Sequence, residues 1–307
     1  MPVLLVMTCL LGTWGHATVP RAEGDVVATA LLDAGAAPRR VLRLAQRPGW
    51  SQGMVASVAS EVETVLGAGP ERELRTEYGP EILLPLHVAW QAREGRGRAR
   101  YHLRVGRPEV RAVDEEGMEP AWRLAETLGA VSGRAGEVVL SDRGTPVEAW
   151  LRLGPDASSA LRSLVQGALA SEWLVTPQFP EEPVGPGARW AVARALGPDG
   201  LSVIAYELVS LEGARGRVRF LLQSRSPEGR SAPRAEGELW FDLRRPFPER
   251  LEVIYTSRAE LGTRGARRLD VVRRARVTLE SGGPLAPGSR EMVAAPWIQD
   301  EEQVRAP

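Results

Sequence analysis

Alternating apolar and polar residues recur along most of this chain, and this pattern constrains the fold more than any other feature. From Ile82 to Ala92 every second residue is apolar, and the alternation resumes from Ala99 to Val105 after a turn containing Gly95 and Gly97. Because successive side chains of a β-strand point to opposite faces, a period of two indicates strands with one buried face. Two such segments joined by a short glycine turn predict an antiparallel hairpin.

Similar segments lie on both sides of a helical stretch in the middle of the chain. Strands are expected at residues 41–44, 54–66, 137–140, 146–153, 201–211, 218–222, 239–243, 251–261 and 269–279. A short helix is expected over residues 119–131, with Trp122, Ala125 and Leu128 on one side. Antiparallel meanders with one apolar face close most easily as a curved sheet. We therefore expect a mainly β (α+β) fold, a curved sheet or half-barrel in two similar lobes with one or two covering helices.

The middle of the chain predicts a helix followed by a joint. Residues 156–174 carry apolar side chains at three- and four-residue spacing, which is typical of one buried helical stripe. Its N-cap is expected at Asp156, Ser158 or Ser159. Residues 176–187 are rich in proline and glycine and end the helix, and Trp190 opens the next strand.

The two strand sets resemble each other. Residues 94–101 and 212–220 coincide in their Glu-Gly and Arg pattern when one residue is inserted. We predict a single β-rich domain over residues 39–281, with an internal duplication of 39–155 and 188–281. Residues 282–307 lack periodicity and are rich in Pro and Ala, so a flexible tail is expected there.

The N-terminus predicts export. Residues 2–11 are apolar but too short for a bilayer, which takes about 20 residues. Small residues end at Ala17, so we expect a secretory signal over residues 1–17, cleaved after Ala17, then a linker over 18–38. The mature chain would contain no transmembrane span. It would lie in the periplasm, in the cell envelope or outside the cell, and peripheral association with the envelope is one possibility.

Charge and cysteine content exclude several classes of protein. The 39 basic residues are all arginine and are balanced by 39 acidic residues, whereas a nucleic-acid binder normally carries a basic excess. Cys9 is the single cysteine and lies inside the signal, so the mature chain would have no thiol for disulfides, catalysis or metal. The residues around Cys9 do not match a lipid-attachment site, so anchoring is not favoured.

Two short stretches resemble an uncharacterised family of bacterial secreted proteins and lipoproteins. The run from Phe179 to Trp190 is similar to the family's proline, small apolar residue, glycine and tryptophan signature after a helix. The segment from Gly237 to Leu243, followed by Pro246, is similar to its later Gly-x-x-x-Phe-Asp segment. The resemblance implies a β-rich fold and an envelope location, and it implies no reaction.

Catalytic and metal-binding patterns are weak in this chain. His87 and His102 lie on different strands of one hairpin without further ligands at zinc-site spacing. Asp142 and Asp242 are a conceivable carboxylate pair for a hydrolase, but Asp142 lies in a turn, where aspartate binds its own backbone. We therefore expect no enzyme activity, no cofactor and no metal.

Tryptophan is over-represented, with nine residues beside four Phe and four Tyr. Trp150 and Trp240 lie opposite the apolar faces of their strands, which favours them as binding residues. The leading hypothesis is non-catalytic binding of a lipid or another apolar or amphipathic small molecule under the central helix. Its candidate ligand-binding residues are Trp150, Trp240, Trp173, Leu169 and Trp122.

The alternative is a structural or protein-interaction module of the envelope that acts through the tail or through the Trp150 and Trp240 surface. A face of arginines on two hairpins is a further candidate for binding anionic groups, although glutamates nearby favour a solvated face. It consists of Arg98, Arg100, Arg104, Arg217 and Arg219. The ligand and the oligomeric state stay open.

Overall fold

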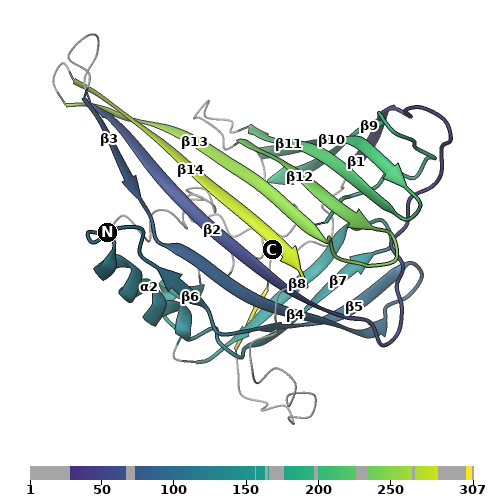
Figure 1. Cartoon of the computed structure of the whole chain (residues 1–307), viewed down its shortest axis with the longest axis horizontal. Coiled ribbons are helices and arrows are strands. Elements are labelled where there is room, and N and C mark those ends of the chain that lie inside the picture. Colours follow the sequence, from purple (N-terminus) through teal and green to yellow (C-terminus); the bar gives the residue numbers. More distant parts are fainter. Residues whose placement is uncertain are drawn as a thin grey trace.

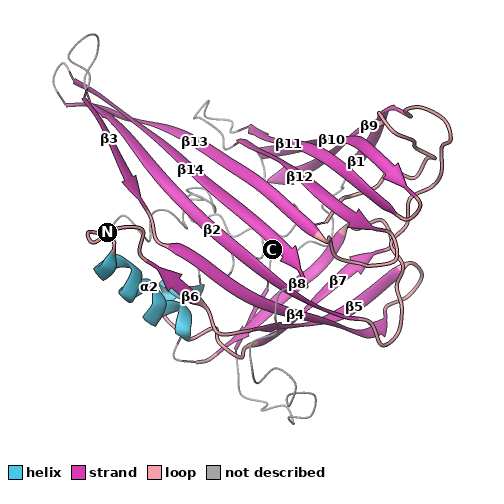
Figure 2. Ribbon diagram, in the orientation of Figure 1, coloured by secondary structure: helices cyan, strands magenta, loops and turns pink. Residues whose placement is uncertain are grey.

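The computed structural model describes residues 28–66, 73–155, 157–162, 165, 176–196, 200–225, 234–264, 267–282 and 302–305. Within these ranges the strands form one large curved antiparallel sheet (Figure 1). Its edge strands do not pair with each other, so the sheet is open. The expected mainly β fold is confirmed, and little helix accompanies the strands (Figure 2).

Two meanders and two edge strands make up the sheet. The first meander contains β2 (Ser51–Leu66), β3 (Glu73–Tyr78), β4 (Glu81–Arg93), β5 (Arg98–Val105), β6 (Glu109–Arg111), β7 (Ala135–Ser141) and β8 (Pro146–Leu153). The second contains β9 (Arg189–Leu196), β10 (Gly200–Glu212), β11 (Arg215–Arg225), β12 (Arg234–Asp242), β13 (Arg250–Arg264) and β14 (Arg267–Ser281). The edge strands are β1 (Ala28–Asp33), which pairs with β9, and β15 (Glu302–Arg305), which pairs with β8.

The two meanders are joined side by side through β14 and β2. These strands pair antiparallel without a bulge from Leu269 opposite Leu66 to Ser281 opposite Met54. One continuous cluster of buried apolar residues includes side chains from both meanders. The two expected strand sets therefore share a sheet and a core, and the internal duplication stays a prediction.

The segment expected to be the first strand, residues 41–44, is not a strand. Leu42 and Leu44 are 0% and 4% exposed, so these two side chains lie in the core, whereas Val41 is 46% exposed. The backbone N–H of Leu44 donates to the carbonyl of Asp142 (2.6 Å), and that of Ala45 donates to the carbonyl of Leu243 (2.7 Å). Its hydrogen-bond donors thus join a turn of each meander instead of a neighbouring strand.

Two further expectations need correction. Residues 28–33, expected in the linker, form β1 and pair with β9. Residues 302–305, expected in the flexible tail, form β15 and pair with β8. Both strands are short and lie at the edges of the sheet, and their pairing with distant strands is not apparent from local composition.

The described helical residues lie where the sequence predicts helices, but the buried side of α2 differs from the expected one. Helix α2 (Met118–Gly129) buries Ala121, Leu124 and Leu128, whereas Trp122 is 67% exposed. Of the expected face of Trp122, Ala125 and Leu128, Leu128 is buried but Trp122 is not, because the buried stripe is turned toward Leu124.

The central helix begins as expected. Residues 159–162 are helical, and the Ser158 Oγ accepts a hydrogen bond from the N–H of Leu161 (3.1 Å), as an N-cap does. Most of residues 163–175 lies outside the described part of the chain. No helix in the described ranges is both long and apolar enough to cross a membrane.

The alternation of side chains gives the sheet an apolar inner face and a charged outer face. Direct cross-strand neighbours on the inner face include Trp190, Tyr206, Phe220, Gly237, Val253, Val277 and Val58. The corresponding outer row is Arg189, Glu207, Arg219, Glu238, Glu252, Thr278 and Ser57. The inner row contains one glycine, and the Phe220 ring lies over it.

We expect Gly237→Ala to lower the free energy of unfolding by about 1–3 kcal/mol, the usual cost of overpacking. An added Cβ would lie 2.1 Å from the Glu252 carbonyl oxygen and 3.0 Å from the Phe220 ring. Urea unfolding followed by circular dichroism measures the change. Glu236→Ala, next to it on the exposed outer face, is the control and should change stability by less than about 0.5 kcal/mol. Equal stability of the two variants would refute this packing argument.

Candidate binding site

The proline and glycine joint after the central helix is a fixed, buried crossing segment. Residues 176–180 are all buried. The Thr176 Oγ1 donates to the carbonyl of Gly144 (2.6 Å), and the Arg143 Nε donates to that of Phe179 (2.8 Å). Further along, Val184 exchanges two backbone hydrogen bonds with Arg40 (2.9 and 3.0 Å). The segment is therefore tied to the turn between β7 and β8 and to the chain before β2.

An aromatic cluster fastens this segment to the sheet. The ring of Phe179 lies 5.1 Å from that of Phe241 and 6.5 Å from that of Trp190, between centroids. Trp190 stacks on Tyr206 at 5.3 Å and donates its Nε1–H to the carbonyl of Gln178 (2.7 Å). Phe179 and Trp190 come from residues 179–190 and Phe241 comes from residues 237–243, so these two stretches meet through packing residues.

The beginning of the central helix packs directly into the core. Leu161 and Val165 are 2% and 5% exposed and belong to the same buried cluster as the inner face of the sheet. Leu169 and Trp173, expected to bind a ligand, lie outside the described residues, as does the expected cleavage site at Ala17. The described apolar residues of the helix are therefore part of the core.

The other candidate tryptophans lie far apart. Trp150 on β8 faces outward as expected but is only 5% exposed, and the Arg152 guanidinium lies 5.6 Å from its ring centre. Trp240 on β12 is half-buried on the outer face, with the Arg250 guanidinium 5.1 Å above its ring. Six strands separate β8 from β12 in the sheet, and Trp122 lies on α2. These three residues do not form one site.

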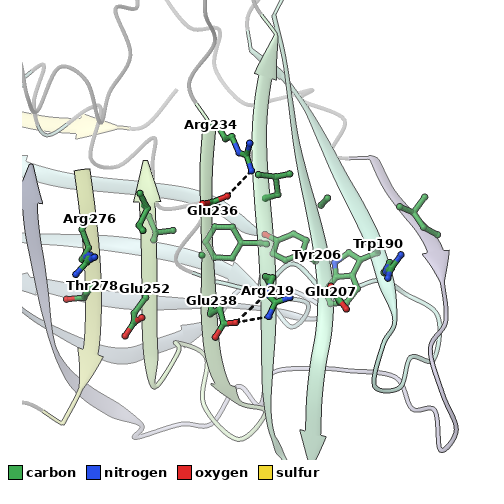
Figure 3. A pocket seen from close by; sticks show the side chains of 18 residues that line it. Trp190, Tyr206, Glu207, Arg219, Arg234, Glu236, Glu238, Glu252, Arg276 and Thr278 are labelled. Carbon is green, nitrogen blue, oxygen red and sulfur yellow. Dashed lines mark hydrogen bonds and ion pairs between the residues drawn. The ribbon is translucent and has the colours of Figure 1, made fainter. Parts of the chain in front are cut away.

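A hollow of about 730 Å³ lies on the second meander, across β1 and β9 to β14 (Figure 3). Trp190, Tyr206 and Phe220 border it but are almost fully buried toward the core, so the hollow opens on the outer face. Its size falls within the range of small-molecule sites. The sequence shows the outward residues of each strand, but their assembly into a hollow depends on pairing and twist.

The floor of the hollow is a mainly apolar strip that Glu236 interrupts, with a charged border. Ala205 lies directly opposite Leu221, Glu236 follows on the next strand, and Ile254 follows on the strand after that. Ile254 is 40% exposed, which is high for an isoleucine in a sheet. The charged lining residues are Arg189, Arg219, Arg234, Arg276, Glu207, Glu236, Glu238 and Glu252.

These charges balance one another. Glu238 accepts hydrogen bonds from Arg217 (3.2 Å) and from Arg219 (3.3 and 3.4 Å), and Glu236 accepts one from Arg234 (2.8 Å). Glu238 and Glu252 are directly opposite, an unfavourable like-charge pair that these arginines and the partner of Glu252, Arg250, compensate. Four arginines and four glutamates leave the lining neutral, which disfavours a strongly charged ligand.

The two histidines lie on the neighbouring strands β4 and β5, each opposite a charged residue. His87 lies opposite Arg104, and His102 lies opposite Glu137, both on the outer face. Burial lowers the pKa of each imidazole, and the positive charge of Arg104 adds to the effect. No group of three or more metal-ligating side chains occurs among the residues that the structure describes.

The candidate carboxylate pair is held by arginines. The Asp142 carboxylate lies 3.6 Å from the Arg43 guanidinium. Asp242 is 1% exposed and accepts hydrogen bonds from the Arg244 side chain and from the Arg244 backbone N–H (3.0 Å). Hydrogen bonds from Arg244 and the charge of Arg215 lower the pKa of Asp242 to about 2. Both residues therefore stabilise turns in this structure.

We expect Asp242 to make folding stability depend on acid pH. Its pKa is lower in the folded chain, so its contribution is complete above the unfolded value of 3.8 and is lost as pH falls toward about 2. The loss amounts to about 2 kcal/mol. Urea unfolding at neutral pH and near pH 2 should show a smaller acid effect in Asp242→Asn than in the parent protein. Asp142→Asn, at a carboxylate that is 39% exposed, is the control and should keep the parental acid effect.

Comparisons with known proteins give no family. No protein-family model matches the chain, and neither does any curated protein. Among solved structures, the TodX deltaS2S3 mutant monoaromatic hydrocarbon channel is 8% identical with a TM-score of 0.22, covering 76% of this chain and 91% of the channel. OccK11 (OpdR) of Pseudomonas aeruginosa is 8% identical with a TM-score of 0.23, covering 78% and 100%. The Pseudomonas putida toluene transporter TodX is 7% identical with a TM-score of 0.16, covering 76% and 90%. TM-scores this low do not indicate a shared fold.

Proposed function

We propose that this is an exported cell-envelope protein that binds a zwitterionic amphiphile in the hollow on the outer face of its second meander, without catalysing a reaction. The observation that carries the proposal is the combination, in one hollow, of an exposed, mainly apolar floor and a neutral border of both charges. It keeps the apolar or amphipathic ligand expected from the sequence but moves the site from the central helix to the sheet.

The apolar strip supplies the binding energy. Leu221 is half-buried, and Ile254 and Ala205 are exposed on the outer face, so a hydrocarbon chain lying across them would remove their apolar surface from water. In the unbound protein these exposed apolar side chains contribute nothing to stability, because they remain in contact with water. The strip runs from β10 to β13 with Glu236 between Leu221 and Ile254, and this length suits an extended chain better than a compact ring.

The border selects the polar group. Arg219 lies between Glu207 and Glu238, so these two carboxylates offset its positive charge. Arg189 and Arg276 also line the hollow and have no ion pair among the described residues. A phosphate would be attracted to such arginines, and an ammonium would be attracted to the facing pair Glu238 and Glu252. A ligand that carries both charges satisfies both groups, whereas a ligand with one charge leaves the opposite group unfavourably close.

The lining offers little for catalysis. The described residues that border the hollow include no histidine, cysteine or serine. The carboxylates of Glu236 and Glu238 already accept hydrogen bonds from arginines, which supports a binding role for this lining.

The ligand preference is tested with three detergents of equal chain length, each below its micelle concentration. Dodecylphosphocholine should bind more tightly than dodecyl sulfate or dodecyltrimethylammonium in isothermal titration calorimetry. We expect a preference of about tenfold, since one uncompensated charge near the border costs on the order of 1.4 kcal/mol. Equal affinity for all three would contradict selection by the border.

The location of the site is tested with paired variants on one strand. Leu221→Glu places a carboxylate in the apolar floor and should weaken dodecylphosphocholine binding at least about tenfold. Gln223→Glu is the control, because Gln223 is the next outward residue of β11 and does not line the hollow. Ile254→Glu and Thr256→Glu form a second such pair on β13. Similar effects within each pair would exclude the hollow as the site.

Export is tested on the full-length chain made in a bacterial host with a Sec pathway. We expect the protein in the envelope fraction to begin at Thr18, because the apolar run and the small residues before it are read as a signal. Intact mass spectrometry measures the N-terminus. Recovery of the uncleaved chain from the cytoplasm would overturn this part of the proposal.

A further inference from the structure

Three apolar side chains are exposed together at the beginning of α2. Val113 is 58% exposed, Met118 is 62% exposed and Trp122 is 67% exposed. Met118 and Trp122 are four residues apart and therefore lie on the same side of the helix, away from the buried Leu124 and Leu128. Clustered apolar residues of this size are uncommon on a monomer surface and mark contact sites. We call Val113, Met118 and Trp122 the α2 patch.

The α2 patch has an acidic border. Between residues 112 and 126 there are five acidic residues and one arginine, although the whole chain is neutral. The arginine, Arg123, is paired with Glu119 on the same helix. Asp114 accepts a hydrogen bond from the N–H of Gly117 (2.7 Å), which holds the turn before the helix, and Glu115 and Glu116 are exposed beside it. The patch therefore combines apolar contact with negative potential.

We infer that the α2 patch is a docking site for a polypeptide segment whose apolar side chains are bordered by lysine or arginine. Trp122 and Met118 provide the apolar contact, as tryptophan and methionine do at many interfaces. Glu115 and Glu116 provide charge complementarity, which guides the encounter and fixes the orientation of the segment. The site is separate from the hollow, which lies on the second meander.

The charge argues against other occupants. The surface of a membrane rich in anionic lipids attracts basic residues, and the acidic border would be repelled from it. Nucleic acid would be repelled for the same reason. An uncharged apolar partner would make no use of the border. A basic and apolar segment is the occupant that satisfies both features.

The probe is a short amphipathic peptide of leucine and lysine, titrated into the full chain by calorimetry. The double variant Met118→Ser and Trp122→Ser should bind it at least roughly tenfold more weakly. Leu74→Ser is the control, because Leu74 on β3 is similarly exposed (59%) and should leave the affinity within about twofold. All three positions are exposed, so the variants should fold, as melting curves will show.

Charge reversal tests the border. Glu115→Lys with Glu116→Lys should reverse the preference, so that a leucine and glutamate peptide binds better than the leucine and lysine peptide. Higher salt should weaken both interactions. The inference would be overturned if charge reversal and higher salt left the peptide affinity unchanged. Stronger binding to phosphatidylglycerol vesicles than to the peptide would overturn it as well. The hollow variant Leu221→Glu should leave peptide binding unchanged, so this result is independent of the proposed ligand.

Discussion

The contact of Phe179 with Phe241 and Trp190 holds this structure together. An open curved sheet exposes its inner face unless something from the same chain covers it. Here the crossing segment after the central helix packs its aromatic residue between two strands of the second meander. The hydrogen bond from the Trp190 Nε1–H to the Gln178 carbonyl also holds the segment against β9. The strand that follows, β9, therefore begins at the far side of the sheet from β8.

Stability and recognition are divided between the two faces of the sheet. The inner face carries the aromatic and aliphatic rows and the close contact of Phe220 with Gly237. The outer face carries arginines and glutamates that neutralise one another, as Arg100 does with Glu94 and Glu137. Because the charges are balanced locally, the exposed apolar residues are the exceptions on this surface. Several of them lie in the hollow and at α2, and the proposals of binding start from these two places.

The sequence predicted which face of a strand a candidate residue occupies more accurately than it predicted how exposed that residue is. Alternation correctly put Trp150 and Trp240 opposite the apolar faces of their strands. It did not show that Trp150 would be buried beneath Arg152, because burial of an outward residue depends on neighbouring strands and their side chains. For Trp122 a small rotation of α2, set by Leu124 and Leu128, decided between burial and exposure.

The sequence by itself determined most of the long strands, their two faces and the beginning of the central helix within residues 156–159, because these depend on residues within a few positions of one another. Only the tertiary structure decided that β14 pairs with β2, that residues 28–33 form an edge strand and that Leu42 and Leu44 lie in the core. Such pairings join segments far apart in the chain, and many registers satisfy the same alternation. The hollow belongs to this second group, because it exists only where β1 and β9 to β14 are brought together.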